Sequence, residues 1–84
     1  MYEVYLEHAA EKDLKRLPME MFQRIIRQIR ALSENQRPQG CRKIVGSKND
    51  WRIRVGSYRV IYEIDENAKA VRVMRVRYRR EAYR

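Results

Sequence analysis

Residues that commonly build cross-linked, metal or cofactor sites are scarce in this 84-residue chain, which has one cysteine, one histidine, three glycines and two prolines. A single cysteine, Cys41, cannot form an internal disulfide, and with one histidine it cannot make a Cys/His zinc site. The sequence also lacks a glycine-rich phosphate loop and a Ser/His/Asp arrangement. We therefore expect no metal and no cofactor, and we interpret Cys41 as a small, partly buried side chain.

Long apolar stretches are also lacking. No run approaches the roughly 18 residues that span a bilayer, and the start, Met1-Tyr2-Glu3, lacks the basic residues and apolar stretch of a secretory signal. The chain is therefore predicted to be cytoplasmic. Its length fits one domain, residues 1–84, with a single core between two packed layers.

Acidic residues are outnumbered, since 20 Lys and Arg stand against 11 Asp and Glu and give a net charge of +9. Arginine makes up 15 of those 20 basic residues. Because a guanidinium group binds phosphate at two points and stacks on bases, this bias favours nucleic acid as a partner. The positive charge predicts either nucleic acid or an acidic protein that masks the same surface as the partner, and an anionic membrane surface is the competing partner.

Hydrophobic spacing predicts a strand, two helices and then four strands. The first helix begins near His8 and ends at Pro18, and the second carries an apolar stripe from Phe22 to Leu32. The segments with strand-like patterns are residues 2–6, 41–45, 51–55, 58–64 and the stretch from 71 onward. Gly56-Ser57 has the composition of a two-residue hairpin turn. We expect an α+β fold in which an N-terminal strand and a helical hairpin pack on a mainly antiparallel sheet, with the order β-α-α-β-β-β-β.

The last strand has a break in its alternation, because its odd positions change from valine to arginine at Arg75. Either a bulge near Met74 shifts the register, or one face leaves the helix-covered core and enters an open cleft. We favour the open cleft. Arg75, Arg77 and Arg79 would then form a ladder with side chains about 6.8 Å apart.

The candidate site is cationic. It draws on one strand, its hairpin partner and the end of the chain: Arg52, Arg54, Arg59, Arg79 and Tyr83. Arginines can neutralise the charge that builds on phosphate oxygens during attack, and a tyrosine can stack on a base or exchange a proton. RNA would supply its own nucleophile, the 2′-hydroxyl. Further RNA contacts are predicted at Lys43, Lys48, Arg75 and Arg77.

Four of the five site residues also have a plain structural explanation. Arg52 and Arg54 alternate with apolar residues, as they would on any solvated sheet face. Arg59 could pair with Glu63, two residues away on the same face. Tyr83 could simply pack on the sheet, so spacing alone leaves function and structure open for all four residues.

Three segments resemble the RelE branch of the RelE/ParE toxin superfamily: AEKDLKRLP at 10–18, WRIRVGSYRVIY at 51–62 and RREAYR at 79–84. The similarity covers nearly the whole chain, in order. It implies a toxin of a type II toxin–antitoxin pair that enters the ribosomal A site and cuts mRNA there without a metal. In the family reaction the 2′-hydroxyl attacks the adjacent phosphate and leaves a 2′,3′-cyclic phosphate and a 5′-hydroxyl.

The resemblance also implies roles for individual residues. Arg52 and Arg54 stand where relatives have basic residues, often lysines, beside the scissile phosphate. Arg59 matches an arginine that contacts this phosphate, and Arg79 matches an arginine near the end of the last strand. Tyr83 matches a tyrosine that stacks on the substrate base and assists proton transfer.

Two departures from the family pattern bear on mechanism. Arginine stays protonated, so at positions 52 and 54 it is a poor general base, and that step falls to Tyr83 or to electrostatics alone. Tyr78 occupies the place where many relatives carry a histidine. Either change could slow cleavage or alter codon preference without abolishing RNA binding.

The implied partners are the ribosome with its mRNA and a RelB-like antitoxin whose acidic segment wraps the domain. Operator DNA would be reached only through the toxin–antitoxin complex. Two alternatives remain at this stage. One is a ParE-like toxin that inhibits DNA gyrase without catalysis, and the other is a module that only binds nucleic acid, with salt-dependent affinity.

Overall fold

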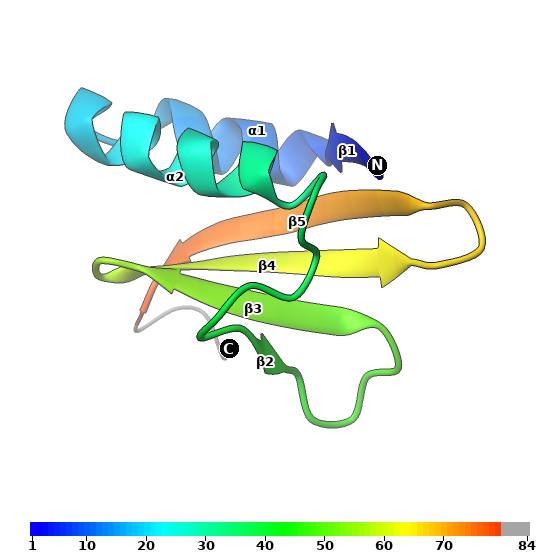
Figure 1. Ribbon diagram of the computed structural model, residues 1–84. Helices are drawn as coiled ribbons and strands as arrows, with labels where there is room; N and C mark the ends of the chain where they lie inside the picture. Colours follow the sequence, from blue (N-terminus) through cyan, green and yellow to red (C-terminus); the bar gives the residue numbers. More distant parts are fainter. Residues whose placement is uncertain (80–84) are drawn as a thin grey trace.

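The computed structural model describes residues 1–79 and folds them into two helices and five strands (Figure 1). The helices are α1 (His8–Lys15) and α2 (Met19–Ala31). The strands are β1 (Glu3–Leu6), β2 (Arg42–Lys43), β3 (Asp50–Val55), β4 (Tyr58–Asp65) and β5 (Ala70–Tyr78). Both the α+β class and the order β-α-α-β-β-β-β predicted from the sequence are confirmed.

The helical hairpin forms because each helix carries one apolar stripe. Ala10 and Leu14 of α1 are buried, as are Ile25 and Ile29 of α2. Pro18 is the N-cap of α2. Proline is tolerated there because the first N–H groups of a helix have no partner within the helix, so its missing N–H costs no hydrogen bond. Within residues 1–79, neither helix is long and apolar enough to cross a membrane. Both stripes face the sheet.

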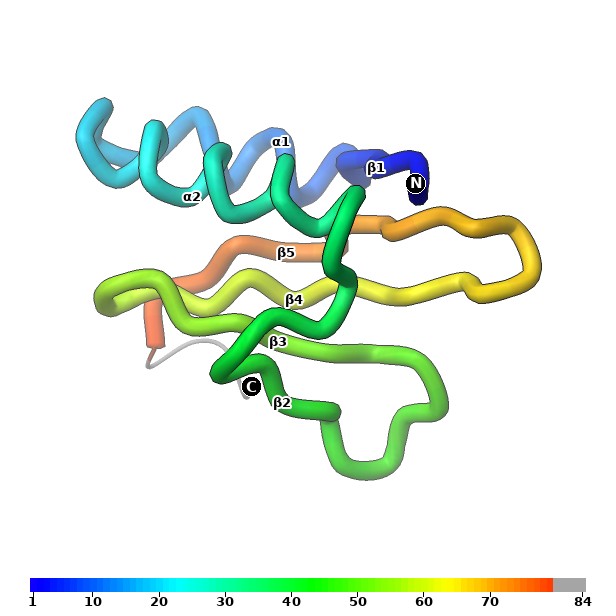
Figure 2. The backbone as a smooth tube through the Cα atoms, viewed as in Figure 1, coloured from blue at the N-terminus to red at the C-terminus, as the bar shows by residue number. Residues whose placement is uncertain are grey.

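The five described strands form one mixed sheet in the order β1-β5-β4-β3-β2. Neighbours are antiparallel except for β1, which lies parallel to β5 at one edge. The tube in Figure 2 shows how the chain leaves α2 and crosses the sheet to reach β2 at the other edge. The sequence predicted the first strand but not its parallel position beside β5.

The core lies between the helices and one face of the sheet. Its sheet side consists of alternating residues of β3, β4 and β5: Ile53, Val55, Val60, Tyr62, Ile64, Val71, Val73 and Val76. Burial raises the pKa of Tyr62, whose hydroxyl donates a hydrogen bond of 2.8 Å to the Gln36 carbonyl oxygen. The opposite face of β3, β4 and β5, which α1 and α2 leave uncovered, is called the open face below.

The predicted hairpin turn at Gly56-Ser57 is confirmed, and it lies against α2. Gly56 has φ +60°, in the left-handed region that glycine adopts readily. A Cβ atom there would lie 3.0 Å from Cε of Met21, in the first turn of α2. The turn end of the β3–β4 hairpin is therefore held close to the start of α2.

A β-bulge interrupts β5, so the open cleft favoured by the sequence analysis is wrong. Tyr62 pairs with Val73 while Ile61 pairs with Arg75, which leaves Met74 as an extra residue. Odd positions face the core before the bulge, and even positions face it afterwards. The shift has a simple cause, because an unbroken alternation would direct arginines into the core and valine into water.

Candidate nucleic-acid interface

Cross-strand pairing aligns arginines into two rows on the open face. Arg54, Arg59 and Arg77 are successive Cα partners across β3, β4 and β5, and we call these three the arginine row. Paired Cα atoms lie about 5 Å apart, so the row places three cationic side chains within about 10 Å at the backbone. The second row, one pleat away, contains Arg42, Arg52, Ile61 and Arg75.

Arg59 is the central and most buried member of the arginine row. It is only 7% exposed, and its Nε is buried without a hydrogen-bond partner among residues 1–79. Its Nη1 lies 3.5 Å from the Tyr58 carbonyl oxygen, at the outer limit of a hydrogen bond. A cation taken out of water destabilises the fold unless hydrogen bonds or an anion compensate. Arg59 is therefore a buried cation whose charge calls for compensation by an anion.

Glu63 does not supply that anion. Its Oε1 accepts a hydrogen bond of 2.9 Å from Nη1 of Arg72, its cross-strand partner on β5. Glu63 therefore pairs with Arg72 and not with Arg59, so the structural explanation offered for Arg59 is wrong.

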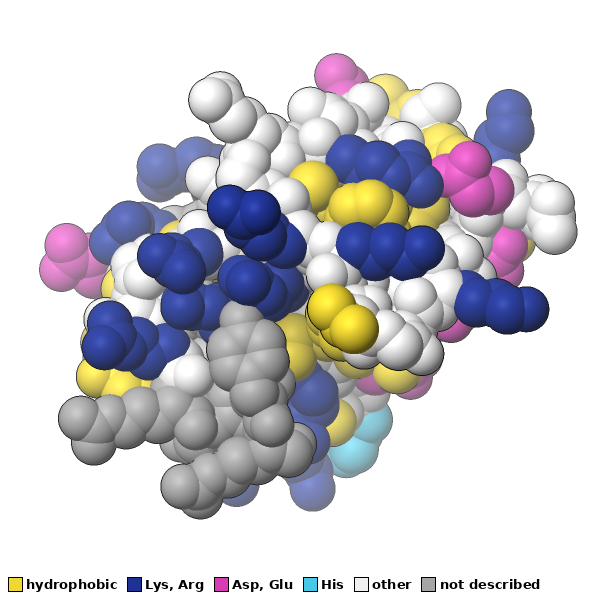
Figure 3. Space-filling model, turned by 90° about the horizontal axis from the view of Figure 1, so that it is seen from below, with side chains coloured by type: hydrophobic (Ala, Val, Ile, Leu, Met, Phe, Trp, Pro, Cys, Tyr) yellow, Lys and Arg dark blue, Asp and Glu magenta, His cyan; other side chains and the backbone are white. Residues whose placement is uncertain are grey.

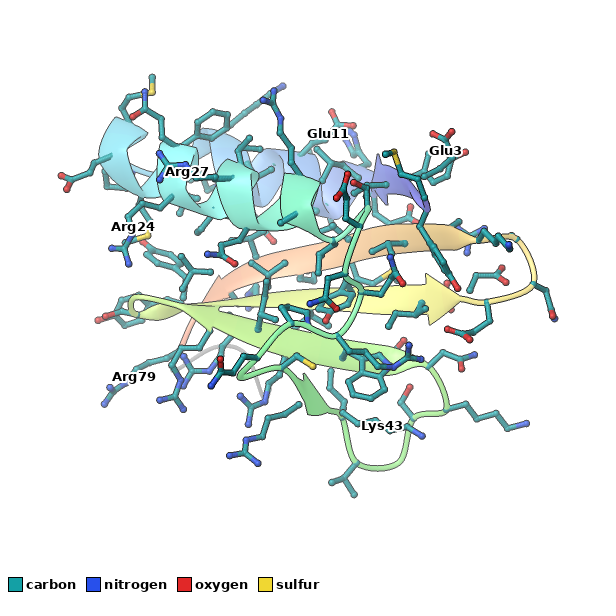
Figure 4. All side chains as sticks on the ribbon, in the orientation of Figure 1. Glu3, Glu11, Arg24, Arg27, Lys43 and Arg79 are labelled. Atoms are coloured by element: carbon teal, nitrogen blue, oxygen red, sulfur yellow. The ribbon has the colours of Figure 1, made fainter. Side chains whose placement is uncertain are left out.

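Arg79 is tied to the β3–β4 turn. Its backbone N–H donates a hydrogen bond of 2.8 Å to the carbonyl oxygen of Ser57. Figure 4 shows the Arg79 side chain at the end of the molecule that carries this turn. Arg54 and Arg59 flank the same turn on β3 and β4. The fold thus brings together three predicted catalytic arginines that come from separate parts of the sequence.

Of the other two predicted catalytic residues, only Arg52 belongs to the described part of the chain. Arg52 lies on the open face one pleat from Arg54, and Ile61 is its partner on β4. It is half-buried, whereas Arg54 is exposed. Tyr83 lies outside the described residues, so its proposed role stays a prediction.

The four predicted RNA-binding residues lie on different parts of the molecule. Arg77 belongs to the arginine row, and Arg75 belongs to the second row. Lys43 is the cross-strand partner of Trp51, which packs against the core, so Lys43 lies on the face opposite to the arginine row. Lys48 is exposed in the loop before β3, at the end of that strand away from the β3–β4 turn. The two lysines are therefore not part of one site with the arginines.

Asp13 is a charged residue near the site that the sequence analysis missed. It is 9% exposed and accepts hydrogen bonds from Nε and Nη2 of Arg75, at 2.8 and 3.2 Å, and from the N–H of Val76 at 2.9 Å. Burial raises its pKa, but these bonds and the charges of Arg75 and Arg77 outweigh burial and hold the pKa of Asp13 below its usual value. A signal was present, because Asp13 sits between Ala10 and Leu14 within the apolar stripe of α1.

A polar groove of about 390 Å³ borders the second row at the edge of β3. It exists because β2 pairs only with Trp51 and Arg52 and leaves the rest of that edge uncovered. Its charged and amide lining residues are Gln28, Gln39, Arg42, Arg52 and Arg54. Arg42 was not predicted, since the short segment 41–45 carried no information on register. An RNA strand bound to the arginine row could continue into this groove.

Positive charge dominates this end of the molecule. Figure 3, which views the protein from below, shows dark blue Lys and Arg side chains gathered toward the side of the β3–β4 turn. In residues 1–79 no three His, Cys, Asp or Glu side chains lie together in a way that could hold a metal ion. The chemistry that these described residues offer is the binding and neutralisation of an anion, for which phosphate is the common biological example.

Comparisons with known proteins agree on the fold. A family model described as "ParE toxin of type II toxin-antitoxin system, parDE" matches residues 4–83. No curated protein sequence matches the chain. Among solved structures, a chain of the RelE–RelB complex from Pyrococcus horikoshii OT3 is 26% identical, with TM-score 0.84 over 96% of this chain and 98% of that one.

Two further solved complexes are similar. A chain of the RelB–RelE antitoxin–toxin complex from Methanococcus jannaschii is 28% identical, with TM-score 0.79 over 94% of each chain. A chain of the toxin–antitoxin complex RelBE2 from Mycobacterium tuberculosis is 25% identical, with TM-score 0.81 over 93% of this chain and 98% of that one. The fold is therefore shared with these structures over 93% to 96% of this chain.

Proposed function

We propose that this chain, which belongs to the ParE toxin family of type II toxin–antitoxin systems within the RelE/ParE superfamily, cuts mRNA in the ribosomal A site. The observation that supports RNA cleavage is the buried Arg59 in the middle of the arginine row. Its Nε lacks a hydrogen-bond partner among the described residues. A phosphate oxygen is an acceptor of the right charge to complete its surroundings.

The substrate supplies the nucleophile in the proposed reaction. The 2′-oxygen attacks the adjacent phosphorus, and the bond from phosphorus to the 5′-oxygen breaks, which yields a 2′,3′-cyclic phosphate and a 5′-hydroxyl. The 2′-hydroxyl loses one proton and the leaving 5′-oxygen gains one. Negative charge grows on the non-bridging oxygens as the fifth bond to phosphorus forms, and this charge is what the protein must stabilise.

The arginines carry this electrostatic task. Arg59 binds a non-bridging oxygen of the scissile phosphate, while Arg54 and Arg79 approach from either side of the β3–β4 turn. Cations held in place beside growing charge need no reorganisation during the reaction, and removing one such group typically costs about 100- to 1,000-fold in rate. Arg52, one pleat away, holds the neighbouring phosphate.

Tyr83 is the proposed group for proton transfer and base stacking. Arg52 and Arg54 stay protonated, so neither can accept the proton of the 2′-hydroxyl. A phenol can pass a proton and its ring can stack on a base. Substitution of lysine by arginine at 52 and 54 therefore leaves this chain more dependent on Tyr83 than relatives with lysines there.

The remaining cations are proposed to contact RNA away from the scissile phosphate. Arg77 lies in the arginine row and extends it toward the edge at β5. Arg75 keeps part of its charge facing outward, since its side chain is 42% exposed beside Asp13. Lys43 and Lys48 lie elsewhere on the molecule, so they would meet a different part of the bound ribosome or message.

A RelB-like antitoxin with an acidic segment is the proposed partner, in the cytoplasm where ribosomes are. The similar structures from P. horikoshii and M. jannaschii are RelE–RelB complexes. A net charge of +9 attracts an acidic segment, and one that covers the open face would also exclude RNA from it. Operator DNA would then be bound only by the toxin–antitoxin complex.

The second candidate is a toxin that inhibits DNA gyrase without catalysis. The name ParE in the description of the matching family favours this candidate. Such a toxin has no need of a phosphate site. Three arginines lie in register and one of them is buried, so repulsion between their like charges destabilises the fold. A toxin that only binds a protein could avoid this cost. The arginine row therefore favours RNA as the target.

Purified protein added to ribosomes stalled on a defined message tests the proposal. We expect a cut within the A-site codon, with a 2′,3′-cyclic phosphate on the upstream fragment, and an intact message when ribosomes are left out. A gyrase supercoiling assay on the same preparation separates the two candidates. An intact message under conditions where an active RelE cuts would overturn the proposal.

A further inference from the structure

Asp13 joins α1 to β5 at the position of the bulge. Its Oδ2 accepts hydrogen bonds from Nε of Arg75 at 2.8 Å and from the backbone N–H of Val76 at 2.9 Å. Its Oδ1 accepts a third from Nη2 of Arg75 at 3.2 Å. Because Asp13 is only 9% exposed, this is a largely dehydrated carboxylate with three donors rather than a surface ion pair.

The Asp13 carboxylate takes the place of a neighbouring strand. β1 accompanies β5 only as far as the pair Leu6 and Val73. Beyond that pair, the described part of the chain provides no strand on this side of β5. The buried N–H of Val76 therefore has no neighbouring strand to bond with, and the Asp13 carboxylate accepts its hydrogen bond instead.

The bulge decides which face of the sheet carries Arg77. Val73 faces the core before the bulge and Val76 faces it afterwards, with Met74 as the extra residue. If β5 paired regularly through Met74, Arg77 would point into the core and Val76 would lie on the open face. The alignment of Arg77 with Arg59 therefore depends on the bulge.

We propose that Asp13 is a positioning residue for the arginine row: by holding Arg75 and Val76 it fixes the bulge and so keeps Arg77 beside Arg59. The use of this row for RNA rests on the proposed function. The register does not, and it can be measured without any RNA. Asp13 acts on β5 through its bonds to Arg75 and Val76 and through the attraction between its charge and Arg77, and it contacts no substrate itself.

A second ion pair on the same strand provides a matched control. Glu63 and Arg72 are joined at 2.9 Å across β4 and β5, before the bulge, with side chains 35% and 37% exposed. Glu63→Gln removes this ion pair, leaves Arg72 with its longer pair to Asp65 at 3.6 Å, and leaves the bulge intact. Any effect of losing an ion pair from β5 in general should appear in this variant as well.

Deletion of Met74 provides a variant that bypasses the bulge. With Met74 removed, Arg75 follows Val73 directly and pairing with β4 becomes regular. Val76 then still faces the core and Arg77 still lies on the open face. In this background the position of Arg77 no longer depends on Asp13.

Cross-strand NMR contacts between Arg59 and Arg77 measure the register in the full chain. We expect Asp13→Ala to lose or broaden these contacts, Glu63→Gln to keep them, and Asp13→Ala in the Met74-deleted chain to keep them as well. Binding of an eight-nucleotide RNA made uncleavable by 2′-O-methyl groups is the second readout. Its affinity should fall about tenfold in Asp13→Ala, as expected for one lost phosphate contact, and change less than about twofold in Glu63→Gln.

Unchanged contacts between Arg59 and Arg77 in a folded Asp13→Ala variant, with only a lower melting temperature, would overturn the inference. If Asp13→Ala does not fold, the same substitution in the Met74-deleted chain decides. A double variant that folds supports the inference, and a double variant that does not fold overturns it. Failure of the unaltered protein to cut mRNA would overturn the proposed function alone, since the register is read without cleavage.

Discussion

Arg54 and Arg59 are cross-strand partners in β3 and β4, so two positive side chains lie side by side on the open face. Like charges directly opposite each other destabilise a sheet, and Arg59 is in addition only 7% exposed. Local conflicts of this kind are expected where function, rather than folding, determines the residue. We therefore interpret the pair as an anion site built at the expense of stability.

Replacing Arg59 should separate stability from activity. Arg59→Leu removes a buried charge and keeps apolar volume, so we expect the free energy of unfolding to rise by about 1–2 kcal/mol. Cleavage of ribosome-bound message should fall at least about 100-fold. Urea unfolding followed by circular dichroism and a single-turnover cleavage assay measure the two effects. Arg27→Leu, on the exposed side of α2, is the control, and a destabilised Arg59→Leu would contradict the account.

Arg79 should matter for chemistry but not for folding. Its side chain is exposed, and Arg79→Ala keeps the backbone hydrogen bond to Ser57, so the free energy of unfolding should change by less than about 0.5 kcal/mol. Loss of its charge beside the phosphate should slow cleavage about 100-fold. Equal cleavage rates for Arg79→Ala and the unaltered protein would remove Arg79 from the site.

Tyr83→Phe tests the proton-transfer role. The ring that stacks on the base is kept and only the hydroxyl is lost, so RNA affinity should stay within about twofold while cleavage slows about 100-fold or more. Affinity for the 2′-O-methylated RNA and the cleavage rate are measured on the same preparations, and circular dichroism checks the fold. A rate equal to that of the unaltered protein would assign the proton to another group.

The Asp13 contacts should make stability depend on acid pH. Since the pKa of Asp13 is lowered in the folded state, its stabilising effect is full above the usual carboxyl pKa near 4 and is lost as pH falls through the folded value. Asp13→Asn should therefore lower the free energy of unfolding by about 2 kcal/mol at pH 7, with a difference that shrinks below pH 4. Urea titrations at pH 7, 4 and 3 measure this, and a constant difference would contradict it.

Much of the fold could be predicted because strong local periodicity determined it. The apolar stripe of α2, the alternation of β3 and β4, and the Gly56-Ser57 turn all lie where the sequence predicted them. The bulge in β5 could not be chosen from the sequence, because it depends on pairing with β4 and on a carboxylate 62 residues earlier in the chain. The parallel pairing of β1 is nonlocal in the same way.

The common face of three site arginines was predictable from the sequence, but the burial of one of them was not. Alternation placed Arg52, Arg54 and Arg59 on the same face, and the structure confirms that arrangement. The burial of Arg59 depends on its neighbours in three dimensions, which no spacing reveals. The position of Lys43 on the other face likewise depends on the register of a two-residue strand.

Primer-extension mapping of a message with a stalled ribosome tests the central claim most directly, with the unaltered protein and Arg59→Leu in parallel. The account predicts one ribosome-dependent cut in the A-site codon, ending in a 2′,3′-cyclic phosphate, and at least about 100-fold less product with Arg59→Leu. An uncut message together with inhibition of gyrase supercoiling, equally strong in both proteins, would contradict it.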